Sequence, residues 1–211
     1  YLSVEQIPVD INKSIHYFML AAKNGNYDAY CNLGFIYYDG EYIKRDINQS
    51  IYYFKLAADK NIVIAQYNLG CVYYEGKYTK IDIFQAIKYF SLAANQNHVE
   101  SQLNLGVIYI DGKFIKPCPD KAIYYLSLAA NQNDSEAQLN LGRIYYEGIY
   151  VERNINKAIM LFTMSANQNN YGAQFNLGMI YYEGKYIEQD IDKSIHYFTL
   201  ASKHNDIFSI C

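Results

Sequence analysis

A unit of 36 residues recurs along the chain without insertion or deletion, and this period constrains the fold more than any other feature. The tripeptide Asn-Leu-Gly begins at Asn32, Asn68, Asn104, Asn140 and Asn176. Six residues after the glycine of each tripeptide a second glycine follows, at Gly40, Gly76, Gly112, Gly148 and Gly184. A period of this length predicts a solenoid, in which similar units stack in line and each unit packs only against its neighbours.

Each unit is predicted to hold two helices, and the first of them, helix A, runs from about Tyr27 to Asp39 in its first copy. In the second copy, Ala65, Leu69 and Val72 fall at helical spacing on one face, which predicts a buried stripe. Glycine inside a helix costs about 1 kcal/mol relative to alanine. Its retention after every Asn-Leu pair therefore indicates that a neighbouring helix passes too close for a side chain. The second glycine is expected to end helix A in the left-handed conformation.

The second helix, helix B, is predicted to begin after a residue that can cap its N-terminus. Asp and Asn accept a backbone N–H bond at this position, and they occur at Asp10, Asp46, Asp82, Asn154 and Asp190. One copy instead has Cys118 followed by Pro119, and proline fits the first helical position because it has no N–H to satisfy. The predicted core stripe of helix B is Ile51, Phe54 and Ala58. A left-handed turn is expected to end the helix at Gly25, Asn61, Asn97, Asn133, Asn169 and Asn205.

The predicted fold is therefore all-α, with five antiparallel helix pairs and partial units at both ends. The full units are expected at residues 27–62, 63–98, 99–134, 135–170 and 171–206. Residues 1–26 would supply a loop and a helix B, and residues 207–211 would start a further helix A. Terminal units of a solenoid usually carry a polar outer face. Because neither end shows one, the array is expected to continue in a longer parent protein.

Composition excludes several functional classes. The net charge of -3 argues against a nucleic-acid partner, which requires clustered Lys and Arg. No apolar stretch approaches the roughly 20 residues of a membrane span, so no membrane partner is expected for this segment. The four cysteines form no ligand spacing or disulfide framework, which favours a reducing, cytoplasmic location without a metal or cofactor. Cys31 is interpreted as a small buried apolar residue, and His16 and His196 as solvated residues.

One stripe of helix A is a candidate binding surface. It lies away from Leu33 and Ile36, and its residues are spaced i, i+4, i+7 and i+11 from Asp28. From the first unit to the fifth it comprises Asp28, Asn32, Phe35 and Asp39; Ile64, Asn68, Cys71 and Glu75; Glu100, Asn104, Val107 and Asp111; Glu136, Asn140, Arg143 and Glu147; and Gly172, Asn176, Met179 and Glu183. The second residue of each set forms an asparagine row, the third is a variable position, and the fourth forms an acidic row.

This pattern suggests a groove for a peptide or protein segment. Asparagine amides both donate and accept hydrogen bonds and could hold an extended backbone. The variable position would select apolar side chains, and the acidic row would favour a basic segment of the partner. A structural interpretation stays open for both rows: the asparagines could bond to the next repeat, and the acids could pair with Lys77, Lys113 or Lys185. Lys116-Pro117-Cys118-Pro119-Asp120 is interpreted as a loop variant, and no catalytic residue set is recognised.

These motifs resemble the Sel1-like repeat, a relative of the tetratricopeptide repeat. The matching residues in one unit are Ala65, Leu69-Gly70, Tyr73, Gly76, Asp82, Ala86 and Ala93-Ala94. The chain departs from the family where a second glycine is common: Tyr42, Tyr78, Phe114, Tyr150 and Tyr186 stand there. The resemblance implies a right-handed α/α superhelix with helix A on its concave side, acting as a non-enzymatic adaptor or scaffold. The alternative is a regulatory or targeting domain of a larger enzyme complex whose catalytic part lies elsewhere.

Overall fold

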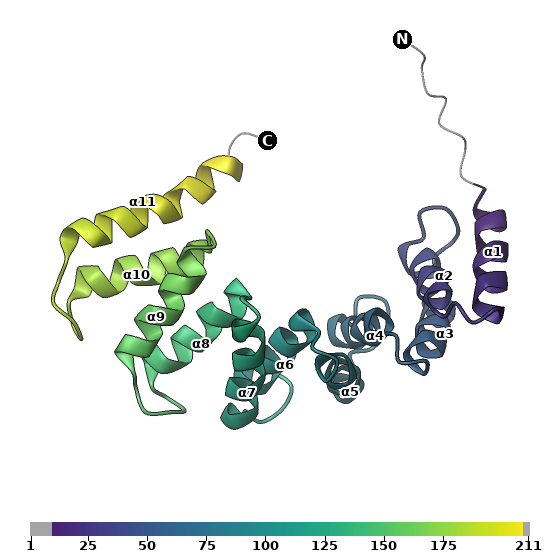
Figure 1. The fold of residues 1–211 in the computed structure, drawn as a ribbon, viewed down its shortest axis with the longest axis horizontal. Helices are drawn as coiled ribbons and strands as arrows, with labels where there is room; N and C mark the ends of the chain where they lie inside the picture. The colour runs from purple at the N-terminus through teal and green to yellow at the C-terminus, as the bar shows by residue number, and fades with distance from the viewer. Residues whose placement is uncertain (1–9, 209–211) are drawn as a thin grey trace, which may run out of the picture. The chain divides into compact units, whose positions relative to one another are not determined.

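The computed structural model describes the backbone of residues 10–208 and the side chains as far as Lys203. This part of the chain contains eleven helices and no strand, which confirms the predicted all-α fold of helix pairs (Figure 1). The helices are α1 (Ile11–Lys23), α2 (Asp28–Asp39), α3 (Ile47–Ala58), α4 (Val63–Glu75), α5 (Ile83–Ala94), α6 (Val99–Asp111), α7 (Pro119–Asn131), α8 (Ser135–Glu147), α9 (Ile155–Ala166), α10 (Tyr171–Glu183) and α11 (Ile191–Phe208). Even-numbered helices are copies of helix A, and odd-numbered helices are copies of helix B.

The chain forms two compact units, residues 1–98 and 99–211. In the first unit, each of the helices α1 to α4 packs against the next one along the chain. The second unit repeats this arrangement with α6 to α11, and α6 also contacts α8. Packing between neighbours along the sequence is what a repeat architecture requires, because no single unit can bury its apolar face alone.

The predicted helix boundaries of helix B follow from local chemistry. Asp46 caps α3 by accepting a hydrogen bond from the backbone N of Gln49 at 3.0 Å, and Asn154 caps α9 in the same way. Cys118 makes no side-chain cap, and α7 begins directly with Pro119 as predicted. Each cap satisfies one backbone N–H that the first helical turn leaves without a partner.

The turns after helix B use the left-handed conformation at four of the expected asparagines. Asn61, Asn97, Asn133 and Asn169 have φ between 62° and 66°. The prediction is wrong for Asn205, because α11 continues to Phe208 without a turn. Each of the four left-handed turns is followed by a copy of helix A, whereas no further helix follows α11 among the described residues. Residues 207 and 208 therefore belong to α11 and do not begin a new helix, while residues 209–211 lie outside the described part of the chain.

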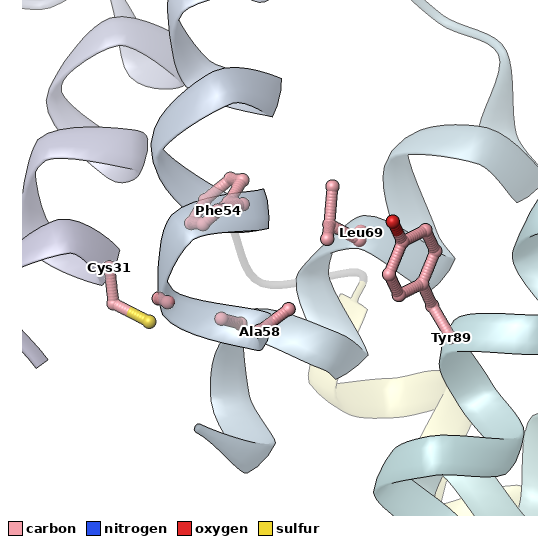
Figure 2. Packing of buried hydrophobic residues seen from close by; sticks show 7 residues of the cluster. Cys31, Phe54, Ala58, Leu69 and Tyr89 are labelled. Carbon is pink, nitrogen blue, oxygen red and sulfur yellow. The ribbon is translucent and has the colours of Figure 1, made fainter. Parts of the chain in front are cut away.

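The core of the first unit lies between successive helix pairs (Figure 2). Phe54 and Ala58 of α3 lie between Cys31 of α2 and Leu69 of α4, and Tyr89 of α5 closes the cluster. Cys31 is 5% exposed, which confirms its interpretation as a small buried residue. Phe54 and Leu69 are fully buried, so these positions contribute about 1.5–3 kcal/mol each through the hydrophobic effect.

The glycine inside helix A is required by a large side chain of helix B. A Cβ atom added to Gly34 would lie 2.5 Å from Cδ1 of Phe54, and one added to Gly142 would lie 2.7 Å from Cε1 of Phe162. The sequence correctly indicated a close approach at this position. The approaching group is a ring of the partner helix, however, and not the helix backbone.

A network of glutamine amides, which the repeat pattern did not predict, joins helix A to the turns that follow helix B. Gln66 is buried in α4, and its Oε1 accepts a hydrogen bond from Nε2 of Gln96 at 2.8 Å. Nε2 of Gln96 also lies 3.0 Å from Oδ1 of Asn61 in the preceding turn. Gln138 and Gln168 repeat the first of these bonds in the second unit at 2.9 Å. The network satisfies buried amides and fixes one turn against the next.

The loop after helix A gives a role to two of the tyrosines that stand where the Sel1-like repeat often has a second glycine, Tyr78 and Tyr186. Arg45 donates from Nε to the carbonyl of Tyr38 at 2.8 Å and from Nη2 to the carbonyl of Asp39 at 2.7 Å. Its guanidinium also lies 4.3 Å from the ring centre of Tyr78, in the next loop. Arg153 and Tyr186 repeat this arrangement at 4.8 Å. The tyrosine thus provides a cation–π contact that links successive loops.

Gly142→Ala is expected to lower the free energy of unfolding by about 1–3 kcal/mol, because overpacking against Phe162 outweighs the better helix propensity of alanine. Urea unfolding followed by circular dichroism measures the loss. Hydrogen exchange should localise it to α8 and α9, since repeats unfold locally. Met160→Ala on the exposed face of α9 is the control and should change stability by less than about 0.5 kcal/mol. An unchanged or raised stability of Gly142→Ala would contradict the steric explanation.

Gln138→Ala and Gln174→Ala form a matched pair, because the two residues occupy the same position in neighbouring units and both are buried. Oε1 of Gln138 is hydrogen-bonded, whereas Oε1 of Gln174 has no partner among the described residues. Removing Gln138 should cost about 1–3 kcal/mol, and removing Gln174 should cost clearly less. Equal losses in urea unfolding would show that the amide network contributes little.

Candidate functional site

The structure places the candidate stripe of helix A at or near the surface. All members of the acidic row are exposed, as are Phe35 and Arg143 at the variable position. Asn32 is also exposed, whereas the other four members of the asparagine row are half-buried. The residues therefore form neither a closed site nor part of the core, and a partner could reach them from solvent.

Four surface hollows bring several of these residues together. In the first unit, Asn68, Cys71 and Glu75 of α4 line a hollow of about 220 Å³ with Phe35 and Tyr38 of α2. In the second unit, three further hollows include stripe residues. They contain Asn140, Arg143 and Glu147; Asn176, Met179 and Glu183; and Arg143, Gly172 and Asn176. Asn32, Asp39, Asn104, Val107 and Asp111 line none of these four hollows.

The side-chain amides of the asparagine row are used in two ways. Nδ2 of Asn140 donates to the carbonyl of Glu136 at 2.9 Å, within its own helix. Nδ2 of Asn68 and Nδ2 of Asn176 are buried and have no hydrogen-bond partner among the described residues. Within the described part of the chain, none of these three amide nitrogens donates a hydrogen bond to a following repeat. A buried amide without a partner is unfavourable by about 1–3 kcal/mol, so Asn68 and Asn176 each retain an unused donor.

The lysines that could pair with the acidic row lie over neighbouring rings. The ammonium groups of Lys77 and Lys185 are each 5.0 Å from the ring centres of Tyr78 and Tyr186. Lys113 lies 4.8 Å from the ring centre of Phe114.

Tyr38 and Tyr146 line two of these hollows, and the repeat pattern did not predict either residue as part of the site. The hydroxyl of Tyr38 lies 3.5 Å from the carboxylate of Glu75 in the next helix A. Burial and this carboxylate together raise the pKa of Tyr38. Burial and the Glu183 carboxylate likewise raise the pKa of Tyr146. The signal was present in the recurring Tyr-Tyr-Glu-Gly motif, where the tyrosine next to the acid contacts the acid of the following repeat.

Two cysteines and two histidines among the described residues have contrasting environments. Burial raises the pKa of Cys31 and of Cys71 to about 11, so both are neutral thiols at pH 7. His16 and His196 are exposed, as predicted. No group of three or more His, Cys, Asp or Glu residues in the described part of the chain could hold a metal ion. Within residues 10–208, none of the helices has the length and apolar character needed to cross a bilayer.

The chain is similar to solved structures that include a Sel1 repeat protein and a protein with the SLR fold. A protective antigen of uropathogenic Escherichia coli with the SLR fold is 30% identical and matches 96% of the chain with a TM-score of 0.86, and the chain spans 43% of its length. A Sel1 repeat protein from Oxalobacter formigenes is 27% identical, with a TM-score of 0.73 over 90% of this chain and 84% of that protein. An immunity protein from Pseudomonas aeruginosa shares the fold at 20% identity, with a TM-score of 0.51 over 90% of this chain and 72% of its own.

No curated protein matches the chain significantly. The family description "Sel1 repeat" matches six segments of it, at residues 3–26, 28–62, 63–98, 99–134, 135–170 and 172–206. The matched segments cover nearly the whole sequence and follow the helix pairs of the structure. The chain therefore belongs to the Sel1 repeat family.

Proposed function

We propose that this chain is a non-enzymatic scaffold that binds an extended segment of a protein partner along the helix A surface. Sel1 repeats generally serve protein–protein interaction, which supports the class of function. The observation that supports this location is the pair of unused donors, Nδ2 of Asn68 and Nδ2 of Asn176, beside open hollows. Backbone carbonyls of an extended segment are acceptors that could satisfy such an amide in either unit.

The amides need only a small movement to reach a partner. Asn68 and Asn176 are half-buried and line hollows, although their nitrogens are covered in the free chain. The last torsion of asparagine is soft, so a rotation turns the nitrogen toward the opening. Binding would then give the amide a hydrogen bond that it lacks in the free chain, so this bond would stabilise only the complex.

The surroundings of the amides define the segment that fits. The hollow beside Asn68 has apolar walls from Phe35, Phe54 and Val72, and the exposed carboxylate of Glu75 lies at its edge. The hollow beside Asn176 pairs Phe162 and Met179 with Glu183 in the same way. This combination favours a partner segment in which apolar side chains alternate with Lys or Arg.

The double variant Asn68→Ala/Asn176→Ala should weaken peptide binding without loss of stability. A suitable probe is a peptide selected on the intact chain from a displayed random library, with affinity measured by fluorescence anisotropy. Affinity should fall at least 10-fold, whereas the free energy of unfolding should not fall and should rise, because each alanine removes a buried donor that has no partner in the free chain.

The matched control is Asn48→Ala/Asn156→Ala, which removes two exposed asparagines of helix B. It should leave both affinity and stability unchanged. Two results would count against the proposal: a large loss of stability in Asn68→Ala/Asn176→Ala, which indicates a structural role, or unchanged affinity for every selected peptide.

The acidic row is tested by Glu75→Gln/Glu183→Gln with a selected peptide that contains Lys or Arg. Its affinity should fall about 3- to 10-fold at low salt, and its dependence on salt should become weaker because exposed charges are screened. Glu152→Gln/Glu188→Gln, two exposed loop acids, controls for net charge. An equal effect of both double variants would show that only the overall charge matters.

A further inference from the structure

The three arginines of the chain have different environments. Arg45 and Arg153 donate hydrogen bonds to the carbonyls that end a helix A, and each lies over a tyrosine ring. Arg143 is exposed at the variable position of α8, and its guanidinium has no hydrogen bond or ion pair among the described residues. It is the only cation among the variable positions, which otherwise hold Phe35, Cys71, Val107 and Met179.

Arg143 lines the largest of the four hollows, which has a volume of about 480 Å³. Phe175 and Phe198 give this hollow apolar walls, and the half-buried Asn176 contributes its unused amide nitrogen. A cation and a free amide donor beside two aromatic rings match a ligand that carries a negative charge next to a bulky apolar group.

Gly172 keeps this hollow open. The other units have Asp28, Ile64, Glu100 or Glu136 at the same position. A Cβ atom added to Gly172 would lie 3.0 Å from Leu139 and 3.8 Å from Nη2 of Arg143, so a longer side chain would enter the space beside the guanidinium. Gly172 also lies in the first turn of α10, where the helix dipole favours a negative charge.

The two nearby acidic residues, Glu136 and Glu147, do not pair with Arg143 in the described part of the chain. Oε1 of Glu136 accepts a hydrogen bond from Nδ2 of Asn170 at 2.6 Å. Glu147 lies one turn further along α8, and it forms no ion pair with Arg143 in the described part of the chain. The largest hollow shares Arg143 with a second hollow and shares Asn176 with the hollow that contains Glu183. A bound segment could therefore contact more than one of these hollows.

We propose that Arg143 binds the carboxylate of an Asp or Glu side chain within the partner segment, while an adjacent bulky apolar residue packs against Phe175 and Phe198. This inference rests on the proposed function and adds a charge rule to it. Most of the acidic row selects basic residues, whereas the position opposite Arg143 selects an acidic one. Arg143 thereby sets the register of the segment along the repeats.

The test is a parallel selection of displayed random peptides on the intact wild-type chain, on Arg143→Glu and on Arg143→Met. Wild-type selections should be enriched in Asp or Glu next to Phe, Tyr, Leu or Met. Selections on Arg143→Glu should be enriched in Lys or Arg at that position, and those on Arg143→Met in neither. Wild-type peptides should bind Arg143→Glu about 10- to 100-fold more weakly, as expected for a charge-assisted contact.

Gly172→Glu provides an independent variant, since its carboxylate would pair with Arg143 inside the chain. It should abolish the acidic preference while peptides without Asp or Glu still bind. If the Asp and Glu content is the same on wild type, Arg143→Glu and Gly172→Glu, the inference is overturned but the groove proposal survives. If no peptide is enriched even on the wild-type chain, the proposed function fails, and this inference fails with it.

Discussion

The repeats depend on one contact, in which a glycine of helix A accommodates a large side chain of helix B. Phe54 against Gly34 and Phe162 against Gly142 leave no room for a methyl group. Each isolated helix of 12 or 13 residues would be marginal in water. Burial of the ring supplies the packing that holds the helix pair together, and the short distance makes glycine necessary despite its low helix propensity.

This contact also determines which surface is free for binding. The core face of helix A is occupied by helix B and the neighbouring repeat, so the opposite stripe remains open to solvent. The two kinds of amide in helix A differ in their hydrogen-bond partners. Gln66 is buried and bonded to the turns, whereas Asn68, two residues later, has an amide nitrogen without a partner. Native interiors rarely leave polar atoms unpaired, which makes the asparagine the informative residue.

In the proposed function, the charges on this surface determine the register in which a partner segment binds. An exposed acid precedes the glycine that ends helix A in every unit, after two tyrosines in four units and after Tyr109 and Ile110 in the third. Under the proposed function, these acids would act on a partner in the same way in each repeat. Arg143 breaks that uniformity at one position, and Gly172 provides the space beside it. A solenoid with identical units could bind a segment in several registers, since each shift by one repeat restores the same contacts. A single unlike residue removes this ambiguity.

The sequence by itself determined the period, the helix pairs, the cap at Asp46, the helix start at Pro119, and the left-handed turns at Asn61 and three of its copies, because these features depend on residues close together in the chain. It also located the candidate stripe, since helical spacing fixes which residues share a face. It failed at Asn205, where α11 continues and no further helix follows among the described residues. Only the tertiary structure showed the glutamine network, the lysines over rings and the unused amides. The glutamine bonds join residues about 30 positions apart, the lysine positions depend on side-chain conformation, and the unused amides depend on which donors find an acceptor after packing, so spacing along one helix reveals none of them.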